Sequence, residues 1–300
     1  MIAKTLAFGS PGKLSLKDRQ LVYDGEDGVH RTFPVEDLGF VFIETGRVLV
    51  TSACLQALSE ANVAVVVCGP SHLPQAQLLP FEANATMQET AEAQLEATPA
   101  AQGRLWKRIV QAKLRNQAAL LSALGQPGGG RLENLASAVK NGDPANCEAQ
   151  GARIYFQSLA PTADFRRNPD GVWPNAALDY GYAVLRAAVA RALVGSGLVC
   201  FRGIHHHNRY NPFCLADDVM EAYRPFVDQF VFGPDAPARS SPDGKLTPPI
   251  KAALLSCLTC DVAIGGLKRP LMIALSSTSA SLARCYLEKT PDISLPAFLP

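Results

Sequence analysis

The chain has 300 residues, of which 48% are apolar and 18% charged, and its formal net charge is +1. This composition is typical of a globular protein and excludes an intrinsically disordered one. A chain of this length can bury a sizeable core. The near-zero charge excludes a global positive field, so any contact with nucleic acid must come from local basic patches.

The distribution of apolar residues favours a cytoplasmic protein. The first residues lack the long apolar core of a signal peptide. The most apolar long run, residues 176–200, is interrupted by Asp179, Arg186 and Arg191, and therefore indicates a buried helix rather than a membrane span. Most of the eight cysteines lie in apolar contexts, as buried free thiols do. We expect a reducing, cytoplasmic environment.

The first part of the chain reads as short strands. Alternation and apolar runs predict strands at residues 2–8, 13–16, 20–23, 29–35, 38–43, 47–51 and 63–67. A polar turn at residues 17–19 joins the second and third of them into a hairpin. Between the last two strands, residues 52–61 have helical spacing, with Leu55 and Leu58 facing inward. The prediction is a β-sandwich-like unit with one helix.

The pattern then changes to long helical periods, after a turn-rich stretch at residues 69–74. Helices are predicted at residues 87–96, 102–124, 132–140, 175–199, 250–262 and 271–287, with a further helix after Asp143-Pro144. Residues 165–174 and 233–249 read as loops. We therefore predict an α+β, two-domain protein: a small β-rich N-terminal domain at residues 1–78 and a larger all-α domain at residues 79–300.

A stretch near residue 205 concentrates groups that can do chemistry. Three histidines, 205 to 207, precede a short helix for which Asn211-Pro212 is a plausible start. Helical spacing places Asp217, Asp218, Glu221 and Arg224 on one broad face. Like charges there would repel by about 4 kcal/mol per pair at 4 Å and an effective dielectric of 20. A divalent cation or an arginine would remove that repulsion; solvated acids near a helix N-terminus are the equally weighted alternative.

Two other segments carry charge that bears on function. The predicted helix at residues 102–124 has a basic surface made of Arg104, Lys107, Arg108, Lys113 and Arg115. This is either a solvated helix face or a stripe that contacts phosphates without reading sequence. The helix opened by Asp143-Pro144 holds Glu148, Arg153 and Tyr155. Taken alone, an acid in a first helical turn is usually a partner of the helix dipole.

The chain contains three motifs in this order: residues 146–156 around Glu148, residues 175–182, and residues 206–225. Together with a β-rich start of matching length, they resemble the CRISPR-associated adaptation integrases, the Cas-one family, in the form found in type II systems. The resemblance covers nearly the whole chain. It implies a β N-terminal domain and an α-helical domain that holds one divalent-metal site.

The resemblance also implies the site residues. The family's metal ligands carry over to Glu148, His206 and Glu221, which would also be the catalytic residues, and the metal would be Mg²⁺ or Mn²⁺. Because this sequence has three consecutive histidines, His205 is the alternative ligand. Asp218 matches an additional acid near the site and is either an alternate ligand or a partner of one. Arg153 and Arg224 would contact phosphate or pair with the acids.

The implied reaction is transesterification on DNA: the 3′-hydroxyl of a short captured duplex attacks a phosphodiester of a repeat array, beside the leader. The implied partners are that DNA, a second copy of the chain, and a dimer of a small protein, Cas-two. A structure-selective DNA endonuclease would use the same metal site with water as the nucleophile. A non-catalytic DNA-binding scaffold would need none of the three ligands.

Overall fold

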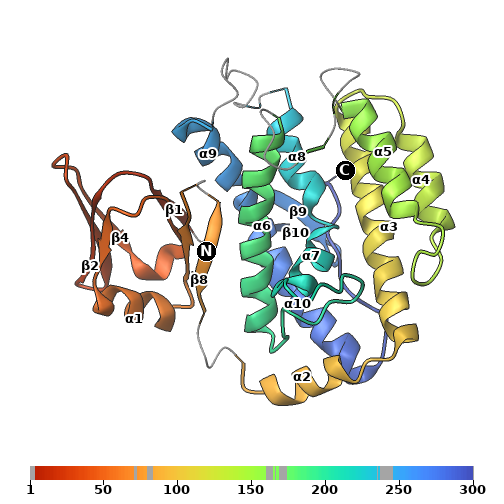
Figure 1. Ribbon diagram of the computed structural model, residues 1–300, viewed down its shortest axis with the longest axis horizontal. Helices are drawn as coiled ribbons and strands as arrows, with labels where there is room; N and C mark the ends of the chain where they lie inside the picture. Colours follow the sequence, from red (N-terminus) through yellow and green to blue (C-terminus); the bar gives the residue numbers. More distant parts are fainter. Residues whose placement is uncertain are drawn as a thin grey trace. The chain divides into compact units, whose positions relative to one another are not determined.

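The computed structural model describes residues 4–70, 73–79, 84–159, 165, 167–168, 174–234, 236 and 246–299. Parts of the loops predicted at residues 69–74, 165–174 and 233–249 lie outside these residues. The chain divides into two compact units, Met1–Ala83 and Asn84–Pro300. The first is rich in strands and the second in helices, which confirms the predicted fold class (Figure 1).

The N-terminal unit consists of two four-stranded sheets. One has the order β1-β5-β7-β8, with β1 and β7 both parallel to β5 and with β8 antiparallel to β7. The other has the order β4-β3-β2-β6, in which β4-β3-β2 is an antiparallel meander and β6 is parallel to β2. The strands are β1 Lys4–Phe8, β2 Gly12–Lys17, β3 Gln20–Gly25, β4 His30–Pro34, β5 Leu38–Ile43, β6 Val48–Val50, β7 Ala64–Cys68 and β8 Pro74–Leu78.

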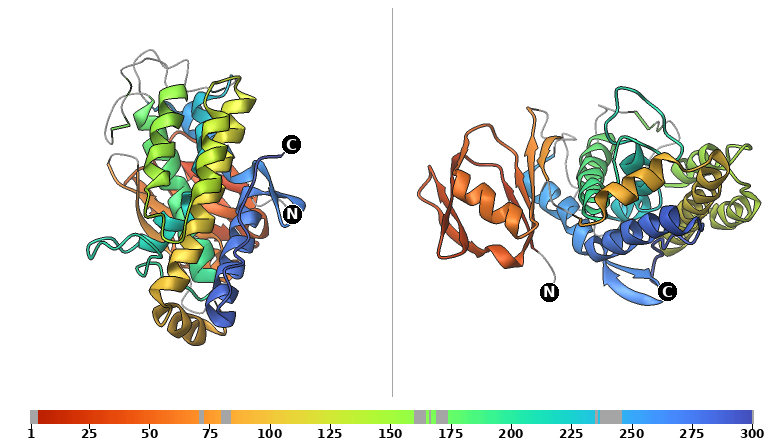
Figure 2. Two further views of the ribbon diagram at one scale, coloured as in Figure 1. Left: turned by 90° about the vertical axis from the view of Figure 1, so that its right-hand side faces the viewer. Right: turned by 90° about the horizontal axis from the view of Figure 1, so that it is seen from below.

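The core of this unit lies between its sheets and helix α1, Ser52–Glu60 (Figure 2). Alternate residues of the strands, such as Leu14, Leu21 and Val41, are fully buried and meet Leu58 from α1. The helix begins where the side chain of Thr51 accepts a hydrogen bond from the backbone of Cys54. Strand β8 was not predicted, because its polar sequence and leading proline are typical of loops; both are tolerated at a sheet edge.

The second unit is built on helices that pack around α6, Asn175–Gly195. Helices α7 Cys214–Met220, α8 Arg224–Phe232, α9 Pro248–Leu255 and α10 Leu271–Glu288 all contact α6. Helices α3 Pro99–Ala123, α4 Gly129–Ala138 and α5 Cys147–Leu159 pack on one another, and α3 also contacts α7 and α8 (Figure 1). Helix α2, Met87–Leu95, packs on α10. The central face of α3 is therefore enclosed by α5 on one side and by α7 and α8 on the other.

The helical unit differs from the sequence prediction near its C-terminal end, where a hairpin replaces part of a predicted helix. The helix predicted at residues 250–262 ends at Leu255, and a 3₁₀ turn, Ser256–Thr259, leads into strand β9, Asp261–Ile264. This strand pairs with β10, Leu267–Pro270, through a turn at Gly265 and Gly266, both of which have positive φ. Among the described residues, no helix is both long and apolar enough to span a membrane.

Candidate metal and DNA-processing site

Helix α5 presents Glu148 from a firmly capped first turn. The carboxylate of Asp143 accepts hydrogen bonds from the backbone N–H groups of Cys147 and Glu148, both at 2.9 Å. Oδ1 of Asn146 accepts a further hydrogen bond from the backbone nitrogen of Ala149, at 3.3 Å. These acceptors satisfy the free N–H groups that begin every helix. The predicted helix start at Asp143-Pro144 is displaced, because the helix begins at Cys147; Asp143 lies four residues ahead of it and still accepts from its first N–H groups.

Lys113 lies at the centre of the site. Its ammonium group donates hydrogen bonds to Oε1 of Glu148 and to Oε2 of Glu221, and the lysine is 5% exposed. Burial acts to lower the pKa of Lys113, but the carboxylates of Glu221 and Glu148 raise it above its ordinary value. The predicted place of Lys113 on the basic surface of its helix is wrong, because the residue is buried. The residue lies four positions after buried Ile109, on the apolar face of α3.

Glu221 is held from two sides. Its Oε2 accepts from Lys113, and its Oε1 accepts from Nε of Arg224 at 2.7 Å. Burial opposes ionisation of Glu221, but the charges and hydrogen bonds of Arg224 and Lys113 lower its pKa to about 2. Glu221 is therefore a carboxylate at neutral pH.

The single helix predicted through this stretch is in fact two. Helix α7 ends at Met220, and α8 begins at Arg224 with Pro225 in its first turn, where a proline is tolerated. The predicted start at Asn211 is also displaced, since α7 begins at Cys214. The break places Glu221 in the turn between the helices, with Arg224 still within hydrogen-bond reach.

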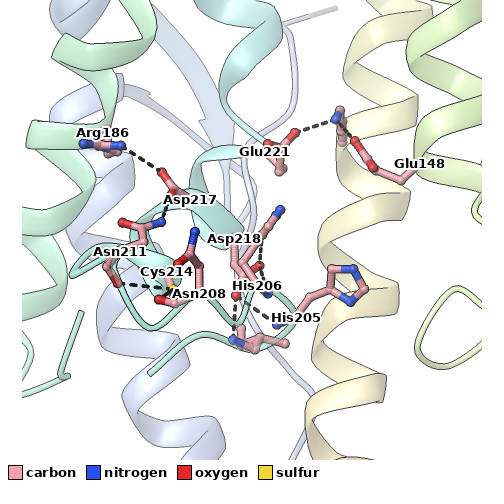
Figure 3. A network of polar contacts seen from close by, with 12 residues as sticks. Glu148, Arg186, His205, His206, Asn208, Asn211, Cys214, Asp217, Asp218 and Glu221 are labelled. Atoms are coloured by element: carbon pink, nitrogen blue, oxygen red, sulfur yellow. Dashed lines mark hydrogen bonds and ion pairs between the residues drawn. The ribbon is translucent and has the colours of Figure 1, made fainter. Parts of the chain in front are cut away.

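Asp218 is fully buried and fixes the loop that carries the histidines. Its Oδ2 accepts from the backbone nitrogens of Ile204 and His205, at 2.5 and 2.9 Å. Its Oδ1 accepts from the backbone nitrogen of His206 at 3.1 Å and lies 2.6 Å from Nδ1 of the same histidine. The hydrogen bond to Asp218, against the opposing effect of burial, raises the pKa of His206. Asp217, by contrast, accepts from Asn211 at 2.6 Å (Figure 3).

The two candidate histidines are in different environments. The ring of His205 stacks on Trp106 of α3, with centroids 4.3 Å apart and an interplanar angle of 3°. The ring of His206 meets Trp106 edge-on, at 5.9 Å. Figure 3 shows the ring of His205 turned toward α3, while Glu148 and Glu221 face each other from α5 and the turn after α7. Nδ1 of His206 is engaged by Asp218, so Nε2 is the ring nitrogen of this histidine that could hold a cation.

A buried polar network lies beneath the carboxylates. The hydroxyls of Tyr182 and Tyr155 donate to the two oxygens of Asp228, at 2.5 and 2.7 Å. The guanidinium of Arg224 lies over the Tyr182 ring, 4.4 Å from its centroid. Burial raises the pKa of Asp228 to about 6, although the tyrosine hydrogen bonds act to lower it. This network holds Arg224, and through it Glu221, in place.

Two small cavities open beside Glu148. One, of about 210 Å³, is lined by Lys113, Gln117, Glu148, Phe156, Arg167, Tyr182, Glu221, Arg224 and Asp228. The other, of about 260 Å³, is lined by Trp106, Asp143, Asn146, Glu148 and His205. Of the three ligands implied by the resemblance, Glu148 and Glu221 border these hollows, and His206 lines neither of them.

The donor set suits a hard divalent cation. Two carboxylates and one imidazole fit Mn²⁺ and Mg²⁺, and a positive charge, that of Lys113, already lies between Glu148 and Glu221. The hydrogen bond between Asp218 and His206 is the carboxylate–histidine arrangement that orients metal-binding imidazoles. Within the described part of the chain, no three acidic, histidine or cysteine side chains are arranged around a common point, so Glu148, His206 and Glu221 do not form a ligand set in this structure.

The other basic residues of interest lie at the surface. Arg108, Arg115 and Arg153 are exposed, and Arg104 and Lys107 are partly exposed. Each comes from α3 or α5, the helices that carry Lys113 and Glu148.

Gln117, Asp143 and Trp106 border the site but were not predicted as parts of it. The sequence signal that could have indicated Gln117 is its position on the helix. Gln117 and Lys113 are polar residues four apart on a helix face that is otherwise apolar, and such residues need partners.

CRISPR-associated proteins match this chain over most or all of its length. The family model of CRISPR associated protein Cas1 matches residues 6–234. The CRISPR-associated endonuclease Cas1 of Neisseria meningitidis serogroup C is 35% identical over 302 residues, which span 100% of this chain and 98% of that protein. The chain belongs to the Cas1 family. This confirms the predicted family and the predicted class of CRISPR-associated nuclease.

Solved structures show the same fold at low sequence identity. A casposase bound to integration product matches with a TM-score of 0.79 at 18% identity, covering 96% of this chain and 91% of that one. A Cas6-RT-Cas1–Cas2 complex contains a chain that matches with a TM-score of 0.72 at 18% identity; the match covers 97% of this chain and 36% of that one. The arrangement of a β-rich unit followed by a helical unit is therefore shared with these proteins.

Proposed function

We propose that this protein is a metal-dependent DNA integrase of CRISPR adaptation, which inserts short captured duplexes into a repeat array. The observation that carries the proposal is the convergence of Glu148 and Glu221 on one point, with His206 oriented by Asp218 on the adjoining loop. Membership in the Cas1 family and the fold shared with a casposase bound to integration product support it.

Glu148, His206 and Glu221 would hold one Mg²⁺ or Mn²⁺. When bound, such an ion stabilises negative charge on a phosphodiester under attack and lowers the pKa of an attacking hydroxyl. Glu148 is fixed by the capped start of α5, Glu221 by Arg224, and His206 by Asp218. No side chain acts as a covalent nucleophile in this proposal, because the attacking group is the 3′-hydroxyl of the incoming DNA.

DNA would lie along the basic surface of α3 and α5. Arg108, Arg115 and Arg153 are exposed there, and they would contact phosphates without reading bases. Arg104 and Lys107 would add to the same surface. Arg224 is engaged with Glu221 and Tyr182, so its proposed role is to position the carboxylate.

The proposed partners follow from the relatives. A solved complex that contains Cas1 and Cas2 has a chain with this fold, which supports assembly with a small Cas2 partner. The β-rich unit is the proposed surface for pairing with a second copy of the chain. Mass photometry of the protein alone and with Cas2 would test both; a monomer that does not bind Cas2 would contradict them.

The test of function is a strand-transfer assay. A labelled short duplex and a supercoiled plasmid carrying a leader and repeat are mixed with the protein and its Cas2 partner, in Mn²⁺, Mg²⁺ or EDTA. Joining should require the metal and fall by at least about 100-fold in Glu148→Gln, Glu221→Gln and His206→Ala. Glu133→Gln, at an exposed acid on α4, is the matched control and should retain joining.

The products separate the alternatives. Cleavage without joining would favour an endonuclease that uses water as its nucleophile, the activity that the names of the relatives suggest. Joining that survives all three substitutions would leave these residues structural and would overturn the proposed site.

A further inference from the structure

The cation that bridges Glu148 and Glu221 is a side chain of the protein itself. Lys113 donates to one oxygen of each acid and is almost fully buried. Both oxygens of Glu221 are engaged, Oε2 by Lys113 and Oε1 by Arg224. A metal ion bound between Glu148 and Glu221 would occupy the position that the ammonium of Lys113 holds, so this ammonium must withdraw before the ion can bind there.

Arg224 is the more firmly fixed of the two cations. Besides its hydrogen bond to Glu221, its guanidinium lies over the ring of Tyr182, and that ring's hydroxyl is held by Asp228. Lys113 has a long, flexible side chain that ends in a single point charge, and its hydrogen bonds run to the two proposed ligands. Lys113 is therefore the cation that can move.

An acceptor for the displaced ammonium lies one turn along α3. Gln117 is 2% exposed and lines the same cavity as Lys113 and the two acids. Its Oε1 is buried without a hydrogen-bond partner. A buried carbonyl oxygen without a partner is costly and needs a reason. Because residues four apart on a helix are neighbours, the ammonium of Lys113 can reach this oxygen by rotation of its own side chain.

We propose that Lys113 closes the metal site of the free protein: its ammonium occupies the point between Glu148 and Glu221 that a divalent cation takes, and moves to Oε1 of Gln117 when the cation binds. The inference rests on the proposed function, because it assigns the metal to these acids. It gives the two acids a partner in the absence of metal, and it makes metal binding a competition between two cations for the same oxygens.

Mn²⁺ binding measured by electron paramagnetic resonance, on folded protein without DNA, tests the inference directly. Lys113→Met removes the competing charge and keeps a flexible, unbranched side chain, so the dissociation constant for Mn²⁺ should fall by about tenfold or more. If the ammonium instead stayed in place and supported the ligands, the same substitution would weaken binding. Lys140→Met, at an exposed lysine after α4, is the matched control and should leave the constant unchanged.

The role of Gln117 is tested by a double-mutant cycle. Gln117→Met removes the acceptor and should weaken Mn²⁺ binding in the wild-type background, because the displaced ammonium then has no partner. In the Lys113→Met background the same substitution should have no effect. Equal effects in both backgrounds would overturn the assignment of Gln117 as the acceptor.

A stability measurement covers the case in which a variant folds poorly. Without metal, Lys113→Met leaves two neighbouring carboxylates without their shared cation, so its melting temperature should fall in EDTA and recover in Mn²⁺ by more than that of the wild type. Lys113→Gln keeps a hydrogen-bond donor without the charge, and its melting temperature should also fall in EDTA and recover in Mn²⁺. Variants that Mn²⁺ stabilises no more than it stabilises the wild type would contradict the inference.

The outcomes also separate this inference from the proposed metal site. Glu221→Gln should abolish Mn²⁺ binding if the site is correct. Suppose that the wild type binds Mn²⁺, that Glu221→Gln does not, and that Lys113→Met binds no more tightly than the wild type. That result would support the metal site and refute the proposed role of Lys113. If Glu221→Gln binds Mn²⁺ as tightly as the wild type does, both the metal site and the proposed role of Lys113 are refuted.

Discussion

Asp218 and His206 are joined by a hydrogen bond of 2.6 Å between Oδ1 and Nδ1, and the same carboxylate also holds the backbone of the histidine loop. One buried acid therefore fixes both the position of the loop and the orientation of the imidazole. The acid lies twelve residues from the histidine in the sequence, on a different element.

Substitution of Asp218 by Asn should separate these two effects. Asn keeps the shape and one acceptor oxygen but loses the charge, so the pKa of His206 should fall from its raised value toward that of a free histidine. We expect Mn²⁺ affinity to fall by about 10- to 100-fold. NMR of the imidazole gives the pKa, and the Mn²⁺ titration gives the affinity. An unchanged pKa would contradict the role of Asp218.

The sign of the pH dependence follows from the same hydrogen bond. The pKa of His206 is raised in the folded protein, so its contribution to stability is complete below its unfolded value of about 6.5 and is lost as the pH rises through the folded value. Protons and metal compete for the imidazole, so Mn²⁺ affinity should increase over this same rise in pH. Unfolding and Mn²⁺ titrations between about pH 5.5 and 8.5 measure both; an affinity independent of pH would exclude an imidazole ligand.

His205 should contribute to stability by stacking its ring on Trp106, and its nitrogens should not contribute to Mn²⁺ binding. His205→Phe keeps an aromatic ring on Trp106 and should retain both stability and Mn²⁺ binding. His205→Ala removes the stack and should cost about 0.5–1.5 kcal/mol in the free energy of unfolding. Chemical denaturation and the Mn²⁺ titration check these results. Loss of Mn²⁺ binding in His205→Phe would move the ligand from His206 to His205.

The close approach of α5 to α3 should depend on Gly151. A Cβ atom there would lie 2.1 Å from Cδ2 of Leu114, which is fully buried. Gly151→Ala should therefore cost about 1–3 kcal/mol and displace the helix that carries Glu148. Gly130→Ala, where nothing lies within 4 Å of the added atom, is the control and should be neutral or stabilising. Denaturant unfolding that shows no difference between the two variants would contradict this packing.

The exposed arginines should contribute to DNA affinity by binding phosphates. Replacing Arg108, Arg115 or Arg153 by Gln should weaken binding similarly for unrelated sequences and reduce the salt slope by about one for each arginine that binds a phosphate. Arg284→Gln, at an exposed position on α10, should change neither. Fluorescence anisotropy over a range of salt concentrations measures both quantities. An unchanged slope in all three variants would place the DNA elsewhere.

The sequence predicted most of the fold because its periodicities are local. The apolar runs of β5 and β7 and the long apolar period of α6 are visible without the structure. Strand β8 and the β9–β10 hairpin were missed because they are short and partly polar, and only pairing makes them strands. The break between α7 and α8 was missed because the charge spacing continues across it.

The candidate site was predictable in its acids and histidines but not in its organisation. Glu148 and Glu221 lie 73 residues apart in sequence, and nothing in the spacing shows that one lysine joins them. That bridge depends on how α3 packs between α5 and the turn after α7, which is a property of the folded unit. The burial of Lys113 could have been inferred only from its place on an apolar helix face.

The most direct test of the metal site is a crystal structure with Mn²⁺, located by its anomalous scattering. We predict one strong peak at about 2.1 Å from an oxygen of Glu148, an oxygen of Glu221 and Nε2 of His206, with Lys113 withdrawn from the two acids. A peak at His205, a peak elsewhere in the protein, or Lys113 still bridging the carboxylates in Mn²⁺-saturated crystals would contradict the assignment.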